Sequence, residues 1–360
     1  MSGRERAIRA LNFQPVDRVP IWGGWITGAD FLEYLSGKSY WDDPWGTIVA
    51  AHRKLGVDLF PGEVYGPHSP EEFRSADFLK LQAEAQAKFK GPEDVLAYVN
   101  SLPDPETLKK EFDYEASYSE LLQDIKQKQE DLEDDILWLP VFRTCYFNWH
   151  LQFGNENFFL ALGLYPGAMK KLFEYAGEVA RLDNQMRADL LRNEGLPLAM
   201  FNGVDLCDNR GPLVSPEQLR EIYFPNLKRA LQPLVDVGVT IIWHSDGNIV
   251  PLLADLIDCG VRGFQGFQEE AGVKLEELPK LRLPTGKKPA LWGSMSVSRT
   301  LPFGTVDDVK REVERCIDIL APGGGYFLGP TNTVGPEVPH QNLLAMHEHA
   351  QDYWRISGDD

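Results

Sequence analysis

The twelve residues VGVTIIWHSDGN at positions 237–248 decide the fold and mark its candidate site. The run through Trp243 is mostly apolar, which is typical of a strand buried on both faces of a parallel sheet. His244 and Asp246 follow directly, and residues i and i+2 of an extended segment point to the same side. Both side chains are therefore expected in one cavity at the C-terminal end of the strand, where parallel α/β folds carry their chemistry. The alternative is a structural strand end, with a hydrogen-bonded His and an Asp that caps the next helix.

Seven other segments resemble this strand in being short, apolar and bounded by Gly, Pro or Asp. The eight candidates together are Arg18–Gly23, Val57–Tyr65, Ile136–Arg143, Leu198–Asp205, Val239–His244, Val261–Phe267, Ala290–Met295 and Gly325–Pro330. Amphipathic segments separate them, and Leu219–Val235 and Val306–Leu320 are the clearest predicted helices. Eight alternating units predict an α/β fold of the (β/α)8 TIM barrel type. A doubly wound open sheet is the alternative, but no GxGxxG motif follows the first strand.

The whole chain, residues 1–360, is expected to form this one barrel domain, because no linker rich in Gly, Ser or Pro divides it. The residues before the first strand would form an N-terminal extension. Residues 78–135 have helical patterns without barrel periodicity and are expected to form an inserted cap or side layer. Residues 27–53 are rich in Trp, Tyr and Asp, and are expected to cover the mouth of the barrel.

Composition restricts the partners of this chain. The net charge of −18 and the pI near 4.9 argue against nucleic acid, because phosphate binding needs clustered Lys and Arg. No apolar run reaches the ~18 residues of a membrane helix, and no signal peptide is visible at the N-terminus. The four cysteines are widely spaced, without a CxxC pair. These features predict reduced thiols and a cytoplasmic protein that binds neither nucleic acid nor membrane, and they leave the oligomeric state open.

Polar and aromatic residues gather after the predicted strands, as a single cavity at the barrel mouth requires. The polar residues are Glu63, Arg143, Asn202, Asp205, His244, Asp246, Gln268, Glu269, Glu270, Ser294, Thr331 and Asn332. Aromatic side chains nearby predict a largely apolar wall for a flat or methyl-bearing ligand, with core packing as the alternative. The residues expected to contact such a substrate are Trp22, Trp25, Tyr65, Arg143, Trp149, Asn202 and Asn332.

Five motifs, in this order, resemble the uroporphyrinogen decarboxylase-like superfamily. They are RERAIRAL with PVDRVPI (residues 4–11 and 15–21), GPLVSPE (211–217), HSDGN (244–248), LWGS (291–294), and a C-terminal set running from Gly324 through Pro339 to Met346. The resemblance extends from about residue 4 to residue 353. It implies a (β/α)8 barrel, in agreement with the independent count of strands.

The superfamily has two main activities, and one segment discriminates between them. The decarboxylases hold the carboxylates of uroporphyrinogen with paired arginines in an N-terminal motif. This chain has WGGWITG at residues 22–28 instead, and no Arg between Arg18 and Arg53. Because a polycarboxylate needs positive charge at that place, the departure argues against decarboxylation.

The other branch comprises corrinoid-linked methyltransferases, whose known members bind Zn²⁺ through a His-x-Cys pair and a later Cys. By this resemblance His244 matches the His, Asp246 replaces the first Cys, and Thr331 or Asn332 stands near the second. Asp ligates zinc, whereas Thr and Asn are poor zinc ligands. Activation of a thiol is therefore not expected, and an O- or N-methylated donor fits better. Glu269 or Glu270 would complete an oxygen-rich metal site with His244 and Asp246, and Glu269 is the residue expected as the third ligand.

The resulting hypothesis is a methyltransferase that moves a methyl group from a small O- or N-methylated substrate to the cobalt of a corrinoid. Its expected catalytic residues are His244, Asp246 and Asp205. The chain has no Asp-x-His-x-x-Gly corrinoid signature, so a carrier protein would bring the corrinoid. Three alternatives remain: a metal-free acid/base pair of His244 and Asp246, a uroporphyrinogen decarboxylase, and a barrel that binds without catalysis.

Overall fold

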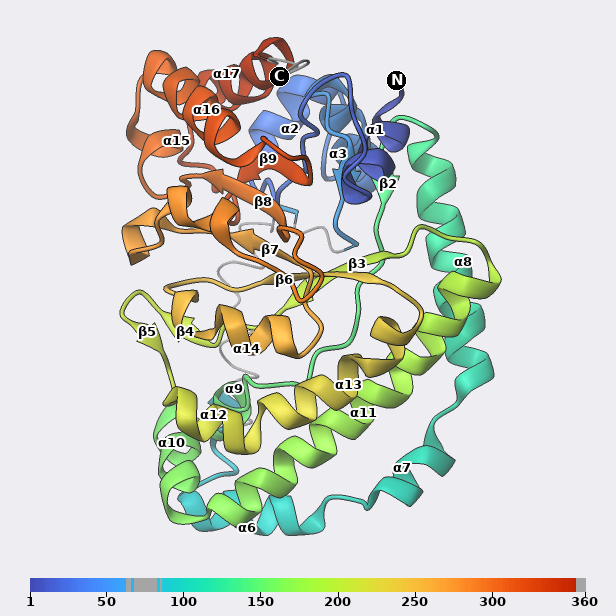
Figure 1. The fold of residues 1–360 in the computed structure, drawn as a ribbon, viewed down its shortest axis with the longest axis vertical. Coiled ribbons are helices and arrows are strands. Elements are labelled where there is room, and N and C mark those ends of the chain that lie inside the picture. The colour runs from blue at the N-terminus through green and yellow to red at the C-terminus, as the bar shows by residue number, and fades with distance from the viewer. Residues whose placement is uncertain (63–65, 68–82, 85, 354–360) are drawn as a thin grey trace.

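The centre of the computed structural model, which describes residues 1–62, 66–67, 83–84 and 86–353, is a parallel β-sheet (Figure 1). Five strands form it in the order β3–β6–β7–β8–β9. Their bounds are Ala199–Gly203 (β3), Thr240–His244 (β6), Gly263–Gly266 (β7), Ala290–Met295 (β8) and Tyr326–Pro330 (β9). These bounds agree closely with the last five predicted strands.

The first three predicted strands are shorter or irregular. β1 (Leu59–Phe60) pairs in parallel with β2 (Leu137–Trp138), and residues 18–23 form only two isolated bridges, Ile21 with Leu328 and Trp22 with Leu59. A further bridge joins Val141 to Phe201 of β3. Together these contacts continue the parallel pairing on both sides of the five-stranded sheet, which is compatible with a TIM barrel. Residues 63–65, which end one of the predicted strands, lie outside the described residues.

Proline explains why these three segments are not regular strands. Each of them contains one, at Pro20, Pro61 or Pro140. Proline has no backbone N–H to donate to a ladder and is rarely found inside a central strand. The segments still occupy strand positions, but the regular pairing stops after a few residues.

Helices occupy most of the remaining described chain. Before β3 they are Gly3–Leu11 (α1), Ala29–Ser36 (α2), Pro44–Lys54 (α3), Pro92–Ser101 (α6), Pro105–Glu111 (α7), Tyr114–Leu132 (α8), His150–Phe153 (α9), Asn155–Leu164 (α10) and Pro166–Asn193 (α11). After β3 they are Pro216–Ile222 (α12), Phe224–Asp236 (α13), Leu253–Asp258 (α14), Thr300–Phe303 (α15), Val306–Leu320 (α16) and His340–Asp352 (α17). A short antiparallel hairpin, β4 (Cys207–Asp208) and β5 (Gly211–Pro212), follows β3. No helix of the described residues is long and apolar enough to cross a membrane.

The two clearest predicted helices have different outcomes. Residues 306–320 form α16 as expected, and Thr305 and Asp308 make a reciprocal capping box at its start. The predicted helix 219–235 is divided into α12 and α13 at Tyr223. Pro225 follows the break, and because proline cannot donate its backbone N–H, it begins a new helix more readily than it continues one.

Two N-terminal regions take up side positions. Within residues 78–135, α6, α7 and α8 contact α11, so the described part of this region forms a helical side layer (Figure 1). The cover over the mouth that is expected of residues 27–53 stays a prediction. These residues contain α2 and most of α3, and the end of α3 is tied to α17 because Gln351 Nε2 donates to Leu55 O (3.2 Å).

An apolar cluster of buried side chains packs between the strands of the sheet and α1. Its members are Ala7, Ala10, Leu11, Trp22, Trp25, Leu59, Leu137, Leu139, Phe201, Ile242, Ala290, Trp292 and Phe327, with Ala199. The N-terminal extension contributes to it through α1, whose buried face contains Ala7, Ala10 and Leu11. Phe201 and Trp292 stack face to face in this cluster, with ring centroids 5.6 Å apart.

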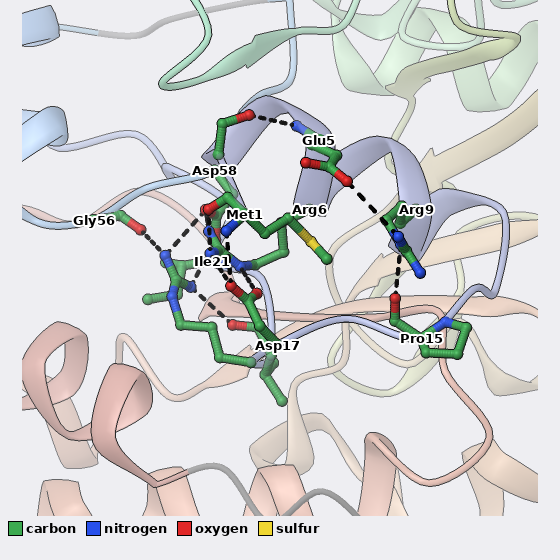
Figure 2. Close-up of polar contacts among 12 residues, drawn as sticks. Met1, Glu5, Arg6, Arg9, Pro15, Asp17, Ile21, Gly56 and Asp58 are labelled. Atoms are coloured by element: carbon green, nitrogen blue, oxygen red, sulfur yellow. Dashed lines mark hydrogen bonds and ion pairs between the residues drawn. The ribbon is translucent and has the colours of Figure 1, made fainter.

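A buried ion-pair network ties the N-terminal helix to the first strand positions (Figure 2). Asp58 has a side chain only 1% exposed and accepts hydrogen bonds from Arg6 Nη1 (2.7 Å) and Arg18 Nη1 (2.8 Å). It also accepts from the backbone N–H of Ile21 (2.8 Å). Arg6 has a second partner in Asp17, which accepts from its Nε (2.6 Å). The network therefore holds α1, the bridge at Ile21 and the start of β1 together.

Two buried histidines, His52 on α3 and His347 on α17, make the fold sensitive to mild acid. Burial lowers the pKa of His52 to about 4 and the pKa of His347 to about 3. Unfolded histidine titrates near pH 6.5, so below that pH the unfolded chain binds protons that the folded chain excludes. Stability should therefore fall as the pH drops from 6.5 toward 4, by about 2 kcal/mol per buried histidine at pH 5.

Urea unfolding midpoints of the wild type at pH 7, 6 and 5 measure this effect. His347→Gln should flatten the pH dependence, because the substituted side chain does not titrate. His340→Gln is the control, since His340 is 37% exposed and paired with Asp30. Equal midpoints at pH 7 and pH 5 in the wild type would contradict the expectation.

Candidate metal and active site

Three ionisable side chains meet at the C-terminal ends of β3 and β6. Asp205, His244 and Asp246 each offer one ligand atom, and these atoms all lie within 4.8 Å of one another. The register of the sheet explains the meeting, because Gly203 of β3 pairs with His244 at the end of β6. The two loops that follow are joined where the backbone N–H of Asp246 donates to Asp205 Oδ1 (2.9 Å).

The loop after β6 is held in shape by its glycine and by the next strand. Gly247 has a φ of +75°, and a Cβ there would lie 2.4 Å from the backbone oxygen of Asp208. Its N–H donates to Gln268 Oε1 (2.7 Å). A side chain at position 247 would be strained in both conformation and space, so the HSDG sequence needs its glycine to place Asp246.

His244 is fixed from one side and open toward the carboxylates on the other. Its Nδ1 lies 2.5 Å from Gln265 Oε1 on β7, and its Nε2 lies 3.9 Å from Asp246 Oδ1. The edge-on ring of Trp25 packs against the imidazole, with centroids 5.5 Å apart. The orientation of His244 is therefore set by a hydrogen bond and by an aromatic wall.

Asp246 has one oxygen engaged and one without a partner. Oδ2 accepts a hydrogen bond from Asn332 Nδ2. Oδ1 is buried and has no hydrogen-bond partner among the described residues. Burial raises the pKa of Asp246, the charge of His244 opposes this rise, and the neighbouring Asp205 adds to it. An unpartnered, partly desolvated carboxylate oxygen is costly to bury, so it points to a ligand or cation as its missing partner.

The donor set fits a divalent metal ion such as Zn²⁺. Zinc binds imidazole nitrogen and carboxylate oxygen, so one histidine and two aspartates would supply three of its ligands. The second ring nitrogen of His244 is hydrogen-bonded, as is usual for a metal-binding histidine. Glu269 does not take part in the cluster as expected. It forms an ion pair with Arg315 on α16, whose guanidinium binds both of its carboxylate oxygens. Asp205 is the third member of the cluster, and a role for Glu269 as a metal ligand stays a prediction.

The predicted aromatic contacts divide into one wall of the site and two packing residues. Trp25 touches His244, as described above. Trp22 is fully buried in the interior cluster and packs against Trp25 with centroids 5.4 Å apart, so it supports the wall from below. Trp149 packs against Tyr146 and Phe153 at the start of α9, and it is 7% exposed. Trp22 and Trp149 both pack against other aromatic rings, and their contact with a substrate stays a prediction.

Among the predicted polar substrate contacts, Asn332 reaches the cluster through Asp246, but two others are engaged elsewhere. Asn202 Nδ2 donates to Phe142 O (2.6 Å) and its Oδ1 accepts from Gly203 N, which ties β3 to the neighbouring segment. Arg143 is 61% exposed and its guanidinium lies 3.6 Å from Asp183 on α11. A contact of either side chain with a substrate stays a prediction. Tyr65 lies outside the described residues.

Two residues near the cluster were not predicted from the sequence. Gln265 lies inside the strand predicted at residues 261–267, and its polar side chain in an apolar run was the available signal. His150 begins α9, and burial lowers its pKa while the charge of Asp205 opposes that shift, so the two groups interact. Its Nδ1 is buried without a hydrogen-bond partner in the described structure. Nothing in the sequence around His150 indicated that it would approach Asp205.

Comparison with known proteins finds a family model that matches the C-terminal part of the chain. Residues 201–353 match the family model described as Uroporphyrinogen decarboxylase (URO-D). The predicted resemblance to the uroporphyrinogen decarboxylase-like superfamily is confirmed. The matched region begins in β3 and contains Asp205, His244, Asp246 and Gln265.

A solved structure has the same fold as this chain over nearly its whole length. It is a methyltransferase from Methanosarcina mazei, which is 17% identical, with a TM-score of 0.62. The alignment covers 98% of this chain and 99% of that chain. At this level of identity the likeness establishes the fold. No curated protein sequence matches the chain.

Proposed function

We propose that this protein transfers a methyl group from a small O- or N-methylated compound to the cobalt of a corrinoid held by a partner protein. The observation that carries the proposal is the oxygen-rich cluster of Asp205, His244 and Asp246 in a superfamily barrel. The methyltransferase fold of the Methanosarcina mazei structure supports it. The proposed barrel is the closed (β/α)8 type, with the cluster at its mouth.

The cysteines support an oxygen or nitrogen leaving atom rather than a thiolate. All four cysteines, Cys145, Cys207, Cys259 and Cys316, are buried and none belongs to the cluster. Cys207 is near in sequence, but burial raises its pKa to about 12, so it is a neutral thiol at physiological pH. Metal sites that activate thiols commonly contain soft thiolate ligands. The cluster of Asp205, His244 and Asp246 contains imidazole and carboxylate ligands instead, which are harder.

Each residue of the site has a role under this proposal. His244, Asp246 and Asp205 would hold Zn²⁺, which when bound acts as a Lewis acid toward the heteroatom that carries the methyl group. The methyl carbon leaves its oxygen or nitrogen for the cobalt nucleophile, and the bonding electrons stay on the heteroatom. His244 Nε2 and Asp246 Oδ1 face the space where that leaving atom must be stabilised. Trp25 excludes water from one side of this space.

Decarboxylation of uroporphyrinogen is not supported by the charges of the site. Residues 19–52 contain no arginine, and the guanidinium of Arg18 is bound to Asp58 in the buried network. The carboxylates of a porphyrinogen would have no paired arginines from this segment to bind them.

The proposal is tested by adding the purified protein to cob(I)alamin with methoxyarenes, methylamines or methyl thioethers, with and without Zn²⁺. We expect methylation of the cobalt, followed in the visible spectrum, with an O- or N-methylated donor and not with a thioether. In parallel, uroporphyrinogen should release no carbon dioxide. Carbon dioxide release without cobalt methylation from any donor would replace the proposal with a decarboxylase.

A further inference from the structure

The side-chain amide of Gln265 has only one orientation that satisfies its surroundings. Gln265 is buried on β7, with 2% of its surface exposed. Its Nε2 donates to the backbone oxygens of Thr331 (3.0 Å) and Pro330 (3.3 Å), and its Oε1 faces His244 Nδ1. The reversed amide would place its oxygen against two carbonyl oxygens, which cannot donate. The two carbonyls at the C-terminal end of β9 therefore direct the amide oxygen toward the imidazole.

This orientation decides which nitrogen of His244 carries the proton. An amide oxygen only accepts, so Nδ1 must be the donor in the contact with Gln265. In the neutral imidazole the lone pair is then on Nε2. We infer that Gln265 is the positioning residue that keeps His244 in the Nδ1–H tautomer and presents the bare Nε2 to Asp246 and Asp205.

The opposite side of the ring supports the same assignment independently. Nε2 lies 3.9 Å from Asp246 Oδ1, which is too long for a hydrogen bond, and Oδ1 has no other partner among the described residues. A proton on Nε2 would have this carboxylate oxygen as a ready acceptor. The distance of 3.9 Å between Nε2 and Oδ1 is expected when both atoms have lone pairs that face a shared cation or hydrogen-bond donor.

The tautomer holds whether or not a methyl group is transferred, whereas its use in catalysis rests on the proposed function. By holding Nδ1–H, Gln265 leaves Nε2 as the nitrogen that binds a metal or takes a proton. It reaches the reaction only through His244, so its role is to position that residue. Its backbone contacts also connect the ends of β7, β9 and β6 around one imidazole.

The tautomer is read directly from two-bond ¹H–¹⁵N correlations of histidine rings in uniformly labelled, metal-free protein. The His244 signals are assigned by their loss in His244→Asn. We expect an Nδ1–H pattern in the wild type and its loss in Gln265→Met, where the ring can adopt the Nε2–H form and donate to Asp246. An Nε2–H pattern in the wild type, or an unchanged Nδ1–H pattern in Gln265→Met, would overturn the inference.

A matched control separates positioning from general structural loss. Gln351 on α17 also donates to two backbone oxygens, those of Leu55 and His347 (both 3.2 Å), but it does not touch the cluster. Gln351→Met therefore removes the same kind of contacts and should leave the His244 tautomer unchanged. Thermal unfolding of both variants verifies that the measured proteins are folded.

Metal affinity gives a second readout that needs no substrate. Titration with Co²⁺ alone, followed by its visible absorption, should show affinity lowered about 10- to 100-fold in Gln265→Met and unaffected in Gln351→Met. If the tautomer changes but the Co²⁺ affinity does not, His244 is not a metal ligand and its positioning serves proton transfer. If no donor supports cobalt methylation while the tautomer changes as expected, the proposed function fails and the inference about Gln265 remains.

Discussion

Asp58→Asn is expected to lower the free energy of unfolding by about 3 kcal/mol, the largest stability loss we expect from a single conservative substitution here. Asp58 compensates two buried guanidinium groups, those of Arg6 and Arg18, whose side chains are 8% and 14% exposed. Asn has no charge, and its amide N–H groups would face the N–H groups of the arginines. The estimate is at the lower end for a broken buried pair because Arg6 retains Asp17.

The loss should also reach the sheet, since Asp58 accepts the backbone N–H of Ile21 at the bridge to β9. Chemical denaturation of Asp58→Asn is the measurement. Asp134→Asn is the matched control, because the pair of Arg4 and Asp134 is 37% and 77% exposed and should contribute no more than about 1 kcal/mol. Midpoints of Asp58→Asn and Asp134→Asn that coincide would show that the network is not needed for stability.

The same ion-pair network explains what the N-terminal motif, residues 4–11 and 15–21, does in the structure. Arg6, Asp17 and Arg18 belong to that motif, and all three take part in the contacts around Asp58. From the sequence, the motif contributed to the family resemblance, but its structural role was not predicted. Asp58 itself is more than fifty residues from Arg6 along the chain, and only folding brings it close.

The strands that could be predicted from the sequence are those in which the local pattern and the hydrogen bonding agree. Residues 290–295 are apolar apart from Ser294, contain no proline and form β8 as predicted. In 18–23 and 136–143 the apolar pattern is as strong, but Pro20 and Pro140 interrupt the ladder. The apolar pattern indicates that a segment is buried, and this holds for β8 as well as for residues 18–23 and 136–143. It does not indicate whether the backbone hydrogen bonds between strands are regular.

The candidate site was predictable where it depended on spacing along one strand. His244 and Asp246 share a side through the i, i+2 rule, and strand order brought Asp205 beside them. The direction of long side chains at strand ends was not predictable. Glu269 turned to Arg315 and Arg143 to Asp183, because each found an opposite charge on a helix. The orientation of such side chains cannot be read from the sequence, because their partners belong to helices that are distant along the chain.

His244→Ala and Asp246→Asn are expected to lower the rate of cobalt methylation about 10²- to 10⁴-fold, the range for loss of a positioned acid, base or charge-stabilising group. His244→Ala removes the single nitrogen donor of the cluster. Asp246→Asn keeps the shape of the side chain but removes the charge that faces Nε2. Both variants should also lose bound zinc, measured by elemental analysis, because each removes one of three ligand groups.

Glu269→Gln is the control that makes this result specific to the cluster. Glu269 has the same charge as Asp246 and follows the neighbouring strand, yet its carboxylate is bound to Arg315 on α16. Its substitution should change methylation by no more than a few-fold and leave the zinc content intact. A loss of zinc in Glu269→Gln as large as that in Asp246→Asn would restore Glu269 as a ligand. Full activity of His244→Ala would instead mean that the leaving heteroatom is stabilised outside this cluster, and the function proposed on its geometry would have to be abandoned.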